Sequence, residues 1–276
     1  MSVPILPVET LRSEPGRGLT ARADELSVEE PLEIRIAGEP LAITLRTPGH
    51  DHELVAGFLL AEGLIRTRAD LGSVVHCGQL GTEGYGNVID VAAAPGTVLD
   101  VEALGHTRRG TLTTAACGLC GRTLINDLLE RLSAPPACEP FTRAFIAESV
   151  LQLRAHQPTF ARTGGLHAAG IVRPGTGFVV VREDVGRHNA VDKAIGRLLL
   201  DGLVPAQGAL LVVSGRISFE LVQKALSAGL AGVVGVSAPS SLAVSTAARF
   251  GLLLCGFARA EGFNVYAGAE HLAGNA

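Results

Sequence analysis

Alternating apolar and polar residues predict strands in the first third of the chain. Residues 32–36 and 41–46 both alternate in this way, and Gly38-Glu39-Pro40 lies between them, which is the pattern of a β-hairpin. Between Asp51 and Ile65, the apolar residues Leu54, Phe58 and Leu59 recur on one face, so we expect a helix there. Two further strands are expected at residues 74–77 and 87–92.

From about residue 141 onward, the pattern changes to strands that alternate with helices. Short apolar runs predict the strands, and apolar residues at helical spacing predict the helices between them. The expected strands are 166–172, 178–181, 209–213, 232–236, 252–256 and 263–266, and the expected helices are 188–200, 218–230 and 240–250. This succession predicts an α/β fold with a mixed sheet. Such sheets usually bind their ligands at the loops that lead from strands into helices.

Changes in composition divide the chain into three parts. Residues 1–25 are rich in Pro, Arg, Glu and Gly and have no hydrophobic period, so we expect a flexible lead-in. Pro135-Pro136 marks a second boundary. We therefore expect a smaller, β-rich N-terminal unit over residues 26–135 and a C-terminal α/β domain over residues 136–276.

The overall composition is that of a globular protein with an aliphatic core. Of the 276 residues, 47% are hydrophobic but only 4% are aromatic and none is Trp. The formal net charge of -4 provides no general attraction to nucleic acid or to an anionic membrane. No apolar run reaches the roughly 18–20 residues of a membrane-spanning helix, and the N-terminus does not have the layout of a signal peptide. We expect a cytoplasmic protein that binds neither nucleic acid nor membrane.

The most informative motif is a pair of thiols, Cys117 and Cys120, separated by two residues. The run at residues 124–132 has apolar residues at helical spacing, so Cys117 is expected near the start of a helix. Unpaired backbone N–H groups and the helix dipole favour a thiolate at that position, and the thiolate is the form that attacks sulfur. We therefore expect catalysis by this pair. The other cysteines, Cys77, Cys138 and Cys255, are scattered, and we interpret them as small, buried apolar residues.

A glycine turn between an apolar strand and a helix suggests an anion site at residues 212–218. Peptide N–H groups at the helix start, the Ser214 or Ser218 hydroxyl and the Arg216 guanidinium could together hold a phosphate beside Gly215. The alternative is an ordinary capped helix with a solvated arginine. The segment does not have the lysine and the spacing of a P-loop.

Polar and charged groups also crowd the turn at residues 183–189. A carboxylate such as Asp184 could accept N–H groups of a guanine, Arg187 could bind phosphate, and His188 could donate to either. The alternative is an N-cap with surface ion pairs. His167 follows a glycine pair at the edge of a strand, and we interpret it as a structural residue.

Two other segments carry weaker signals. Residues 257–262 lie between the last two expected strands and include Arg259, which makes them a candidate ligand loop. The run His50-Asp51-His52-Glu53 contains possible metal ligands, but adjacent side chains at a helix start point in different directions. We therefore do not expect a metal site there.

Several of these segments together resemble the FdhD family of formate dehydrogenase accessory sulfurtransferases. The resemblance runs from about residue 30 to about residue 270, and the string from Glu183 to Lys193 is its most specific part. It is carried by Thr47-Pro48-Gly49-His50-Asp51-His52-Glu53-Leu54-Val55-Ala56-Gly57-Phe58-Leu59, Cys117-Gly118-Leu119-Cys120-Gly121, Thr163-Gly164-Gly165-Leu166-His167-Ala168, Glu183-Asp184-Val185-Gly186-Arg187-His188-Asn189-Ala190-Val191-Asp192-Lys193 and Ser214-Gly215-Arg216-Ile217-Ser218. The resemblance implies a cytidine-deaminase-like fold without the deaminase zinc or another structural metal, assembled as a homodimer.

The resemblance also implies a sulfur relay. Family members receive persulfide sulfur from a cysteine desulfurase and pass it to the bis(molybdopterin guanine dinucleotide) molybdenum or tungsten cofactor. This happens before the cofactor enters the catalytic subunit of formate dehydrogenase, which makes the carrier a maturation chaperone. By position, Cys117 would bear the persulfide and Cys120 would assist or resolve it. The cofactor, or a guanine nucleotide that mimics it, would contact Phe257, Ala258, Arg259, Ala260, Glu261 and Gly262. Further contributions to the nucleotide pocket would come from Asp184, Arg187, His188, Ser214, Gly215 and Arg216.

Two other functions are compatible with the cysteine pair. A dithiol-disulfide oxidoreductase also places Cys-x-x-Cys at a helix start. However, a compact thioredoxin-like module would be expected to be shorter than this chain, in which a long N-terminal region precedes the motif and a second α/β unit follows it. A binding chaperone with structural zinc would use Cys117, Cys120 and two more ligands such as Cys77, His106 or Cys138. No second close pair of good spacing supports that alternative.

Overall fold

The main body of the protein is a six-stranded mixed sheet in the order β12-β11-β10-β9-β7-β8. The computed structural model describes residues 3–78, 85–100 and 129–274. Three central strands are parallel, whereas β7 runs antiparallel to β9 and β12 runs antiparallel to β11. The strands are β7 (His167–Arg173), β8 (Gly177–Asp184), β9 (Leu210–Val213), β10 (Gly232–Gly235), β11 (Leu253–Arg259) and β12 (Gly262–Ala267). The mixed α/β architecture expected from the sequence is therefore confirmed.

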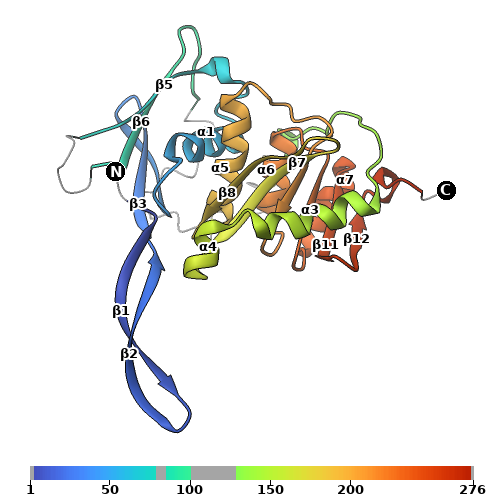
Figure 1. Ribbon diagram of the computed structural model, residues 1–276. Helices are drawn as coiled ribbons and strands as arrows, with labels where there is room; N and C mark the ends of the chain where they lie inside the picture. The colour runs from blue at the N-terminus through green and yellow to red at the C-terminus, as the bar shows by residue number, and fades with distance from the viewer. Residues whose placement is uncertain (1–2, 79–84, 101–128, 275–276) are drawn as a thin grey trace.

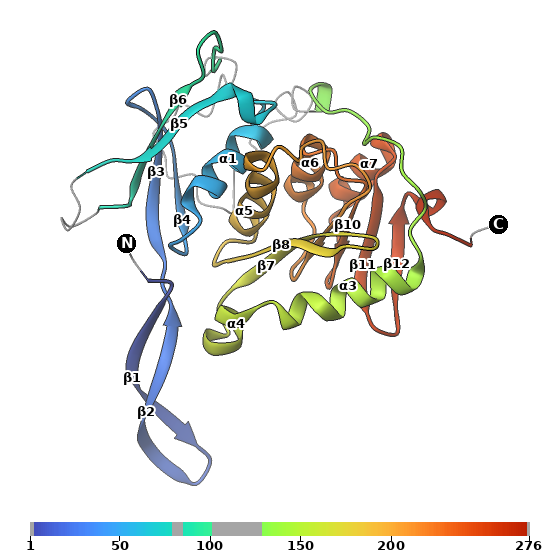
Figure 2. The ribbon, with the colours of Figure 1, turned by 45° about the horizontal axis from the view of Figure 1, so that its top comes forward.

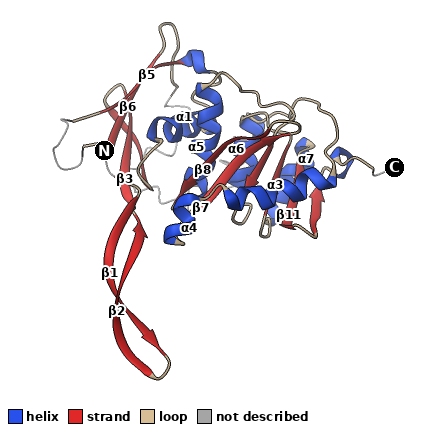
Figure 3. Ribbon diagram, in the orientation of Figure 1, coloured by secondary structure: helices blue, strands red, loops and turns tan. Residues whose placement is uncertain are grey.

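Helices cover both faces of this sheet. On one face lies α3 (Arg143–Ala155), followed by the short α4 (Pro158–Thr163), and on the other face lie α5 (Arg187–Leu200), α6 (Phe219–Ser227) and α7 (Ser241–Phe250) (Figure 2). Short 3₁₀ turns occur at Arg68–Asp70 and Ala269–His271. Colouring by secondary structure makes the layers visible in Figure 3. Within the described residues, no helix is long and apolar enough to cross a membrane.

The strands of the sheet divide their side chains between two hydrophobic cores. Along β9, Leu211 and Val213 join the core under α5, α6 and α7, whereas Leu210 and Val212 join the core under α3. This alternation follows from the two-residue period of a strand, and the Val/Leu run is apolar throughout because both of its faces are covered.

A smaller four-stranded sheet, in the order β4-β3-β6-β5, precedes the main one. Its strands are β3 (Glu30–Ile36), β4 (Glu39–Arg46), β5 (Leu71–His76) and β6 (Val88–Ala93), and α1 (Asp51–Ala61) follows β4. The β3–β4 hairpin and the other two strands match the sequence expectations. The predicted division at residue 135 stays a prediction, although one hydrophobic core contains residues from both sides of it.

Two glycines allow α1 to pack directly against α5. A Cβ on Gly57 would lie 2.0 Å from the Asp192 carbonyl oxygen, and a Cβ on Gly196 would lie 1.8 Å from the Glu53 carbonyl oxygen. Neither position has room for a side chain, so the two backbones approach each other as closely as glycine permits. This contact places the first turn of α1 beside Gly196, in the second half of α5.

The segment expected as a flexible lead-in, residues 1–25, has regular secondary structure that its composition did not predict. Strands β1 (Ile5–Glu14) and β2 (Arg17–Ser27) pair along their whole length as an antiparallel hairpin that projects from the body (Figure 1). Pro15 and Gly16 form the turn, with Gly16 at φ 74°. An ion pair of 2.5 Å between Glu25 and Arg162 ties β2 to α4.

Helix α3 is the largest element that the sequence analysis did not predict. Its buried residues Ile146, Ser149, Val150 and Leu153 follow the i, i+3, i+4, i+7 spacing of a helix. The Thr142 hydroxyl accepts a hydrogen bond from the Phe145 N–H, which caps the helix. Both signals were present in the sequence, but a serine on the apolar face obscured the stripe.

Candidate functional site

The loops that carry the candidate residues lie at one edge of the main sheet. Because β7 is antiparallel to both β8 and β9, strands β8 and β9 run in the same direction. The carboxyl ends of β8, β9, β10 and β11 therefore meet at the same edge, which we call the ligand edge. An open α/β sheet usually binds its ligands there.

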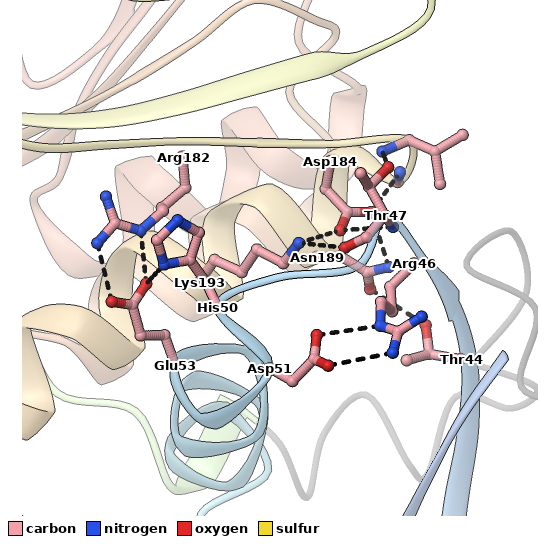
Figure 4. A network of polar contacts seen from close by, with 12 residues as sticks. Thr44, Arg46, Thr47, His50, Asp51, Glu53, Arg182, Asp184, Asn189 and Lys193 are labelled. Carbon is pink, nitrogen blue, oxygen red and sulfur yellow. Dashed lines mark hydrogen bonds and ion pairs between the residues drawn. The ribbon is translucent and has the colours of Figure 1, made fainter. Parts of the chain in front are cut away.

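The first loop of the ligand edge is held by a buried polar network around Asp184 (Figure 4). Asp184 has no exposed surface, and its carboxylate lies 2.6 Å from Lys193 Nζ. It also accepts hydrogen bonds from the backbone N–H of Thr47 and Gly186 and from the Asn189 amide. Lys193 donates in addition to the Thr47 carbonyl at 2.7 Å. The network therefore joins the start of α5 to the loop before α1.

This network corrects the role expected for Asp184. The carboxylate was expected to accept N–H groups of a guanine, but its oxygens already accept internal donors and neither reaches the surface. Glu183 is engaged as well, because it accepts the Thr159 and Phe160 N–H groups at the start of α4. Both carboxylates stabilise the fold around the ligand edge instead of facing a ligand.

His188 is held by side chains of the second loop. Its Nε2 lies 3.1 Å from the Ser218 hydroxyl and 2.5 Å from a Glu220 carboxylate oxygen. The hydrogen bond from His188 is the main reason why the pKa of Glu220 is lowered, and burial opposes it. His188 and Ser218 therefore link the starts of α5 and α6.

Basic side chains gather around Gly215 in the same loop. The His167 ring lies so close that a Cβ on Gly215 would be 3.3 Å from its Nδ1 and 3.9 Å from Arg187 Cδ. Arg187 Nε is buried and has no hydrogen-bond partner among the described residues. Arg216 is exposed. The Ser214 hydroxyl, a predicted phosphate contact, accepts a hydrogen bond of 2.8 Å from the Ala168 N–H.

A third loop, residues 236–240, joins the remaining candidates to this edge. The Ile217 N–H donates to the Ala238 carbonyl, and the Ser240 N–H donates to the Ile217 carbonyl. From the other side, the Phe257 N–H donates to Ser237 and the Arg259 guanidinium donates to the Val236 carbonyl at 2.5 Å. The predicted segments 214–216 and 257–262 thus flank the same loop.

Phe257 has an unusual backbone conformation. Its φ is 50°, in the left-handed region that a bulky residue rarely adopts, and its side chain is 48% exposed. Ala258 is buried, Ala260 and Glu261 form the exposed turn, and Gly262 begins β12. Phe257 lies at an irregularity in the pairing of β11 with β12, and it stays a candidate ligand contact.

The run His50-Asp51-His52-Glu53 has a structural role in the described fold. Arg46 donates to both carboxylate oxygens of Asp51, and Arg182 does the same to Glu53 (Figure 4). Burial raises the pKa of Glu53, but the hydrogen bonds from Arg182 and His50 outweigh it and lower the pKa to about 2. Among the described residues, no cluster of three or more metal-ligating side chains occurs.

The predicted catalytic pair, Cys117 and Cys120, lies outside the described residues, as does most of the helix expected after it. Of the other thiols, Cys255 is fully buried, and burial raises its pKa to about 12. Cys77 and Cys138 are half-buried. The interpretation as buried apolar residues is therefore confirmed for Cys255 and only in part for the other two.

Sequence reasoning assigned His167 a structural role and missed its place beside the candidate residues. The position of His167 beside the candidate residues could have been predicted from the register of the β7–β8 hairpin, in which His167 pairs directly with Asp184. Thr47 and Lys193 were quoted only as part of a resemblance. Thr47 lies 137 residues from Asp184 in the sequence, so no local pattern could have predicted their contact. Lys193 lies only 9 residues from Asp184, so a local pattern could have predicted that pair.

Comparison with known proteins places these features in a family. The model of the FdhD/NarQ family matches residues 27–273. A protein of Anaeromyxobacter dehalogenans strain 2CP-C, named "Sulfur carrier protein FdhD", is 53% identical over 255 residues, covering 90% of this chain and 88% of its own. A protein of the same name from Streptomyces coelicolor is 47% identical over 260 residues, covering 92% of this chain and 91% of its own.

A solved structure supports the fold. The crystal structure of a protein described as a formate dehydrogenase accessory protein from Desulfotalea psychrophila has a TM-score of 0.75 and covers 97% of this chain and 99% of its own. At 24% identity, this likeness concerns the fold alone. The family match and the close relatives cover nearly the whole chain, and the protein described here belongs to the FdhD/NarQ family.

Proposed function

We propose that this protein is a sulfur carrier in the maturation of formate dehydrogenase. The observation that carries the proposal is the identity of 53% to a protein named as a sulfur carrier, over 90% of the chain. The Cys117 and Cys120 pair in the sequence is the chemistry that such a role needs. The protein acts in the cytoplasm as a homodimer, with a cysteine desulfurase as donor and the formate dehydrogenase catalytic subunit as final recipient.

The first step loads sulfur onto Cys117. Its thiolate attacks the terminal sulfur of a persulfide on the desulfurase, the donor S–S bond breaks, and the donor cysteine leaves as a thiolate. The product is a Cys117 persulfide, and no oxidant or reductant is consumed because one sulfane sulfur only changes its partner. This persulfide makes the protein a sulfurtransferase.

The second step releases the sulfur to the cargo. Cys120, as a thiolate, attacks Cys117 Sγ and displaces hydrosulfide, so a Cys117–Cys120 disulfide forms while the sulfane sulfur is reduced. The two electrons come from the two cysteines, and an external thiol must reduce the disulfide before the next cycle. The cargo is the bis(molybdopterin guanine dinucleotide) cofactor, which is the substrate here and not a resident group.

The ligand edge is the place where this cargo would bind. Arg187, His188, Gly215 and Arg216 lie at adjoining loops, and Phe257 and Arg259 reach the same third loop. Arginines and free peptide N–H groups suit the phosphates of a guanine dinucleotide, and an exposed aromatic ring suits its base. A simple guanine nucleotide would then be a mimic of the cargo.

Intact-protein mass spectrometry tests the loading step. Wild type, Cys117→Ala and Cys120→Ala are incubated with a cysteine desulfurase and cysteine. A reductant-sensitive gain of about 32 Da that is absent in Cys117→Ala supports the persulfide. Cys255→Ala is the matched control, because Cys255 is buried and its loss leaves loading unchanged.

The outcome also separates the proposal from a dithiol-disulfide oxidoreductase. Such a protein would gain no sulfur and would lose two protons as the cysteines form a disulfide. That result in wild type would overturn the carrier function. Metal analysis of the same sample tests the alternative of a zinc-binding chaperone.

A further inference from the structure

Strands β1 and β2 form an isolated hairpin, residues 5–27, which we call the arm. Among the described residues, the two strands form a sheet of their own that projects from the body (Figure 1, Figure 2). The end of β2 is attached to α4, where Glu25 pairs with Arg162 and the Ser27 hydroxyl donates to Thr163 at 3.4 Å. A two-stranded hairpin is at best marginally stable in water, so we expect the arm to gain stability from further pairing.

The leucines of the arm are exposed to solvent. Leu11 and Leu19, toward its tip, are 62% and 65% exposed, and Leu6 and Leu26 are about half exposed. Leu11 pairs directly with Ala21, so the two side chains lie on the same face of the arm. More strands beside the arm would extend this apolar face and shield its side chains from water.

The two outer edges of the arm differ in their ability to accept another strand. The Val28 N–H donates to the Pro4 carbonyl, so the even-numbered residues from there to Leu19 direct their backbone groups inward and the odd-numbered ones outward. Pro7 belongs to the outward set and interrupts the edge of β1, because proline has no N–H to donate. The 11 residues of β2 include no proline, so the outer edge of β2 is open to pairing.

One backbone group on the outer edge of β2 shows how that edge is satisfied in a single chain. The N–H of Glu25, an outward group, donates at 2.9 Å to the carboxylate of the neighbouring Asp24. Ala21 and Ala23 are exposed, and their small side chains leave room for a strand alongside. An open edge of this kind is a template for pairing with another chain.

The charges along β2 indicate that the matching strand is a second copy of β2. When two copies pair antiparallel about a two-fold axis at Ala23, the outward backbone groups of each Ala23 meet their counterparts. Arg22 of each copy then lies opposite Asp24 of the other, in a pair without backbone hydrogen bonds, where side chains are closest. An axis at Arg22 or at Asp24 would instead oppose two like charges, so the charges select the register at Ala23.

We propose that β2 is a dimerisation strand, which pairs with β2 of a second copy so that two arms form one four-stranded antiparallel sheet in the order β1-β2-β2-β1. In this sheet the Glu25 N–H donates to the Ala21 carbonyl of the other copy, which frees Asp24 to pair with Arg22. The proposal rests on the homodimer proposed above and assigns it an interface.

Proline substitution on each edge tests the pairing. Ala23→Pro removes an outward N–H from β2, and the matched control Glu9→Pro removes one from β1 directly across the hairpin. Neither change removes an inward hydrogen bond of the arm. In analytical ultracentrifugation, Ala23→Pro should raise the dissociation constant of the dimer about 10- to 100-fold, since the bond is lost twice by symmetry. Glu9→Pro should dimerise as wild type does, and equal dissociation constants in all three proteins would overturn the proposal.

Charge exchange tests the register. Arg22→Asp brings two carboxylates together on each side of the axis and should weaken the dimer about 10-fold. Adding Asp24→Arg to the same chain restores opposite charges and should restore the dissociation constant. A double variant that dimerises no better than Arg22→Asp would overturn the register at Ala23.

A cysteine at the axis tests the same register by cross-linking. The Cα atoms of the two Ala23 residues would lie about 5.5 Å apart, within the range of a disulfide. Ala21→Cys is the matched control on the same face, because its two copies would lie about 13 Å apart. Mild oxidation should give a reductant-sensitive dimer in Ala23→Cys, with the bond located by peptide mass mapping, and neither in Ala21→Cys nor in wild type. An Ala23→Cys protein that does not cross-link would overturn the proposal.

Persulfide loading of Ala23→Pro keeps this proposal distinguishable from the proposed function. Loading needs only the Cys117 thiolate, so it should be unchanged in the variant. If wild type loads sulfur but Ala23→Pro dimerises normally and Ala23→Cys does not cross-link, the arm interface fails alone. If Ala23→Cys cross-links as expected but wild type does not load sulfur, the carrier function fails and the interface remains.

Discussion

Lys193 Nζ lies 2.6 Å from the Asp184 carboxylate, and both side chains are almost completely removed from solvent. The pair connects α5 to the end of β8, and Lys193 also binds the Thr47 carbonyl at 2.7 Å. The ammonium group thus fixes the loop before α1 against the strand end that begins the ligand edge.

Lys193→Met should destabilise the protein strongly, because it leaves the buried Asp184 carboxylate without its counter-charge. We expect a loss of about 3–5 kcal/mol in the free energy of unfolding, measured by urea denaturation. Arg12→Met is the control, since Arg12 pairs with Glu14 at an exposed site and its loss should cost less than about 1 kcal/mol. Equal losses in the two variants would contradict the structural role given to the buried pair.

The crossing of α1 and α5 makes Gly196→Ala unfavourable. Alanine is the better helix former, but its Cβ would stand 1.8 Å from the Glu53 carbonyl oxygen. The helices would have to separate, and we expect a loss of about 3 kcal/mol in the free energy of unfolding. Gly18→Ala is the matched change in open space, where nothing lies within 4 Å of the new Cβ. A stabilised Gly196→Ala protein would mean that the helices do not approach as described.

The elements that could be predicted from sequence are those whose signals are local. Strand β9 is an unbroken apolar run of four residues, and α5 and α7 were placed to within one residue at their starts. Helix α3 was missed because Ser149 lies on its buried face, where the hydroxyl is satisfied by the carbonyls of Phe145 and Ile146. The β1–β2 hairpin was missed because its leucines remain exposed and do not form a one-sided stripe.

The candidate site was less predictable for a different reason. Arg187 and Gly215 could be proposed as candidates because each follows the end of a strand, where the fold class places ligands. Asp184 was given the wrong role, because the sequence shows that the residue is an aspartate but does not show whether its carboxylate faces a buried lysine or solvent. Its partner groups come from Thr47, Gly186, Asn189 and Lys193, and the contact with Thr47 depends on tertiary packing.

Glu53 should make the stability depend on pH in the acid range. Its pKa is about 2 in the folded protein against an ordinary value of 4.5, so the folded state favours the ionised carboxylate. The stabilisation is therefore complete above pH 4.5 and is lost as the pH falls toward 2. We expect Glu53→Gln to cost on the order of 1–3 kcal/mol at pH 7 and progressively less below pH 4, measured by urea denaturation at each pH. A difference between the two proteins that does not change with pH would show that packing, and not the charge, carries the effect.

Phe257→Asn tests whether the strained aromatic residue is kept for binding. Asparagine tolerates a φ of 50° better than phenylalanine does, so the free energy of unfolding should stay the same or rise by up to about 1 kcal/mol. Binding of guanosine 5′-diphosphate should weaken about 5- to 150-fold if the exposed ring stacks on the base, at a cost of about 1–3 kcal/mol. Leu242→Asn removes another exposed apolar side chain, from α7, and should change neither quantity much. Because strain relief and lost stacking act in opposite directions, a stability that falls together with unchanged binding would show that Phe257 packs the fold and does not contact the ligand.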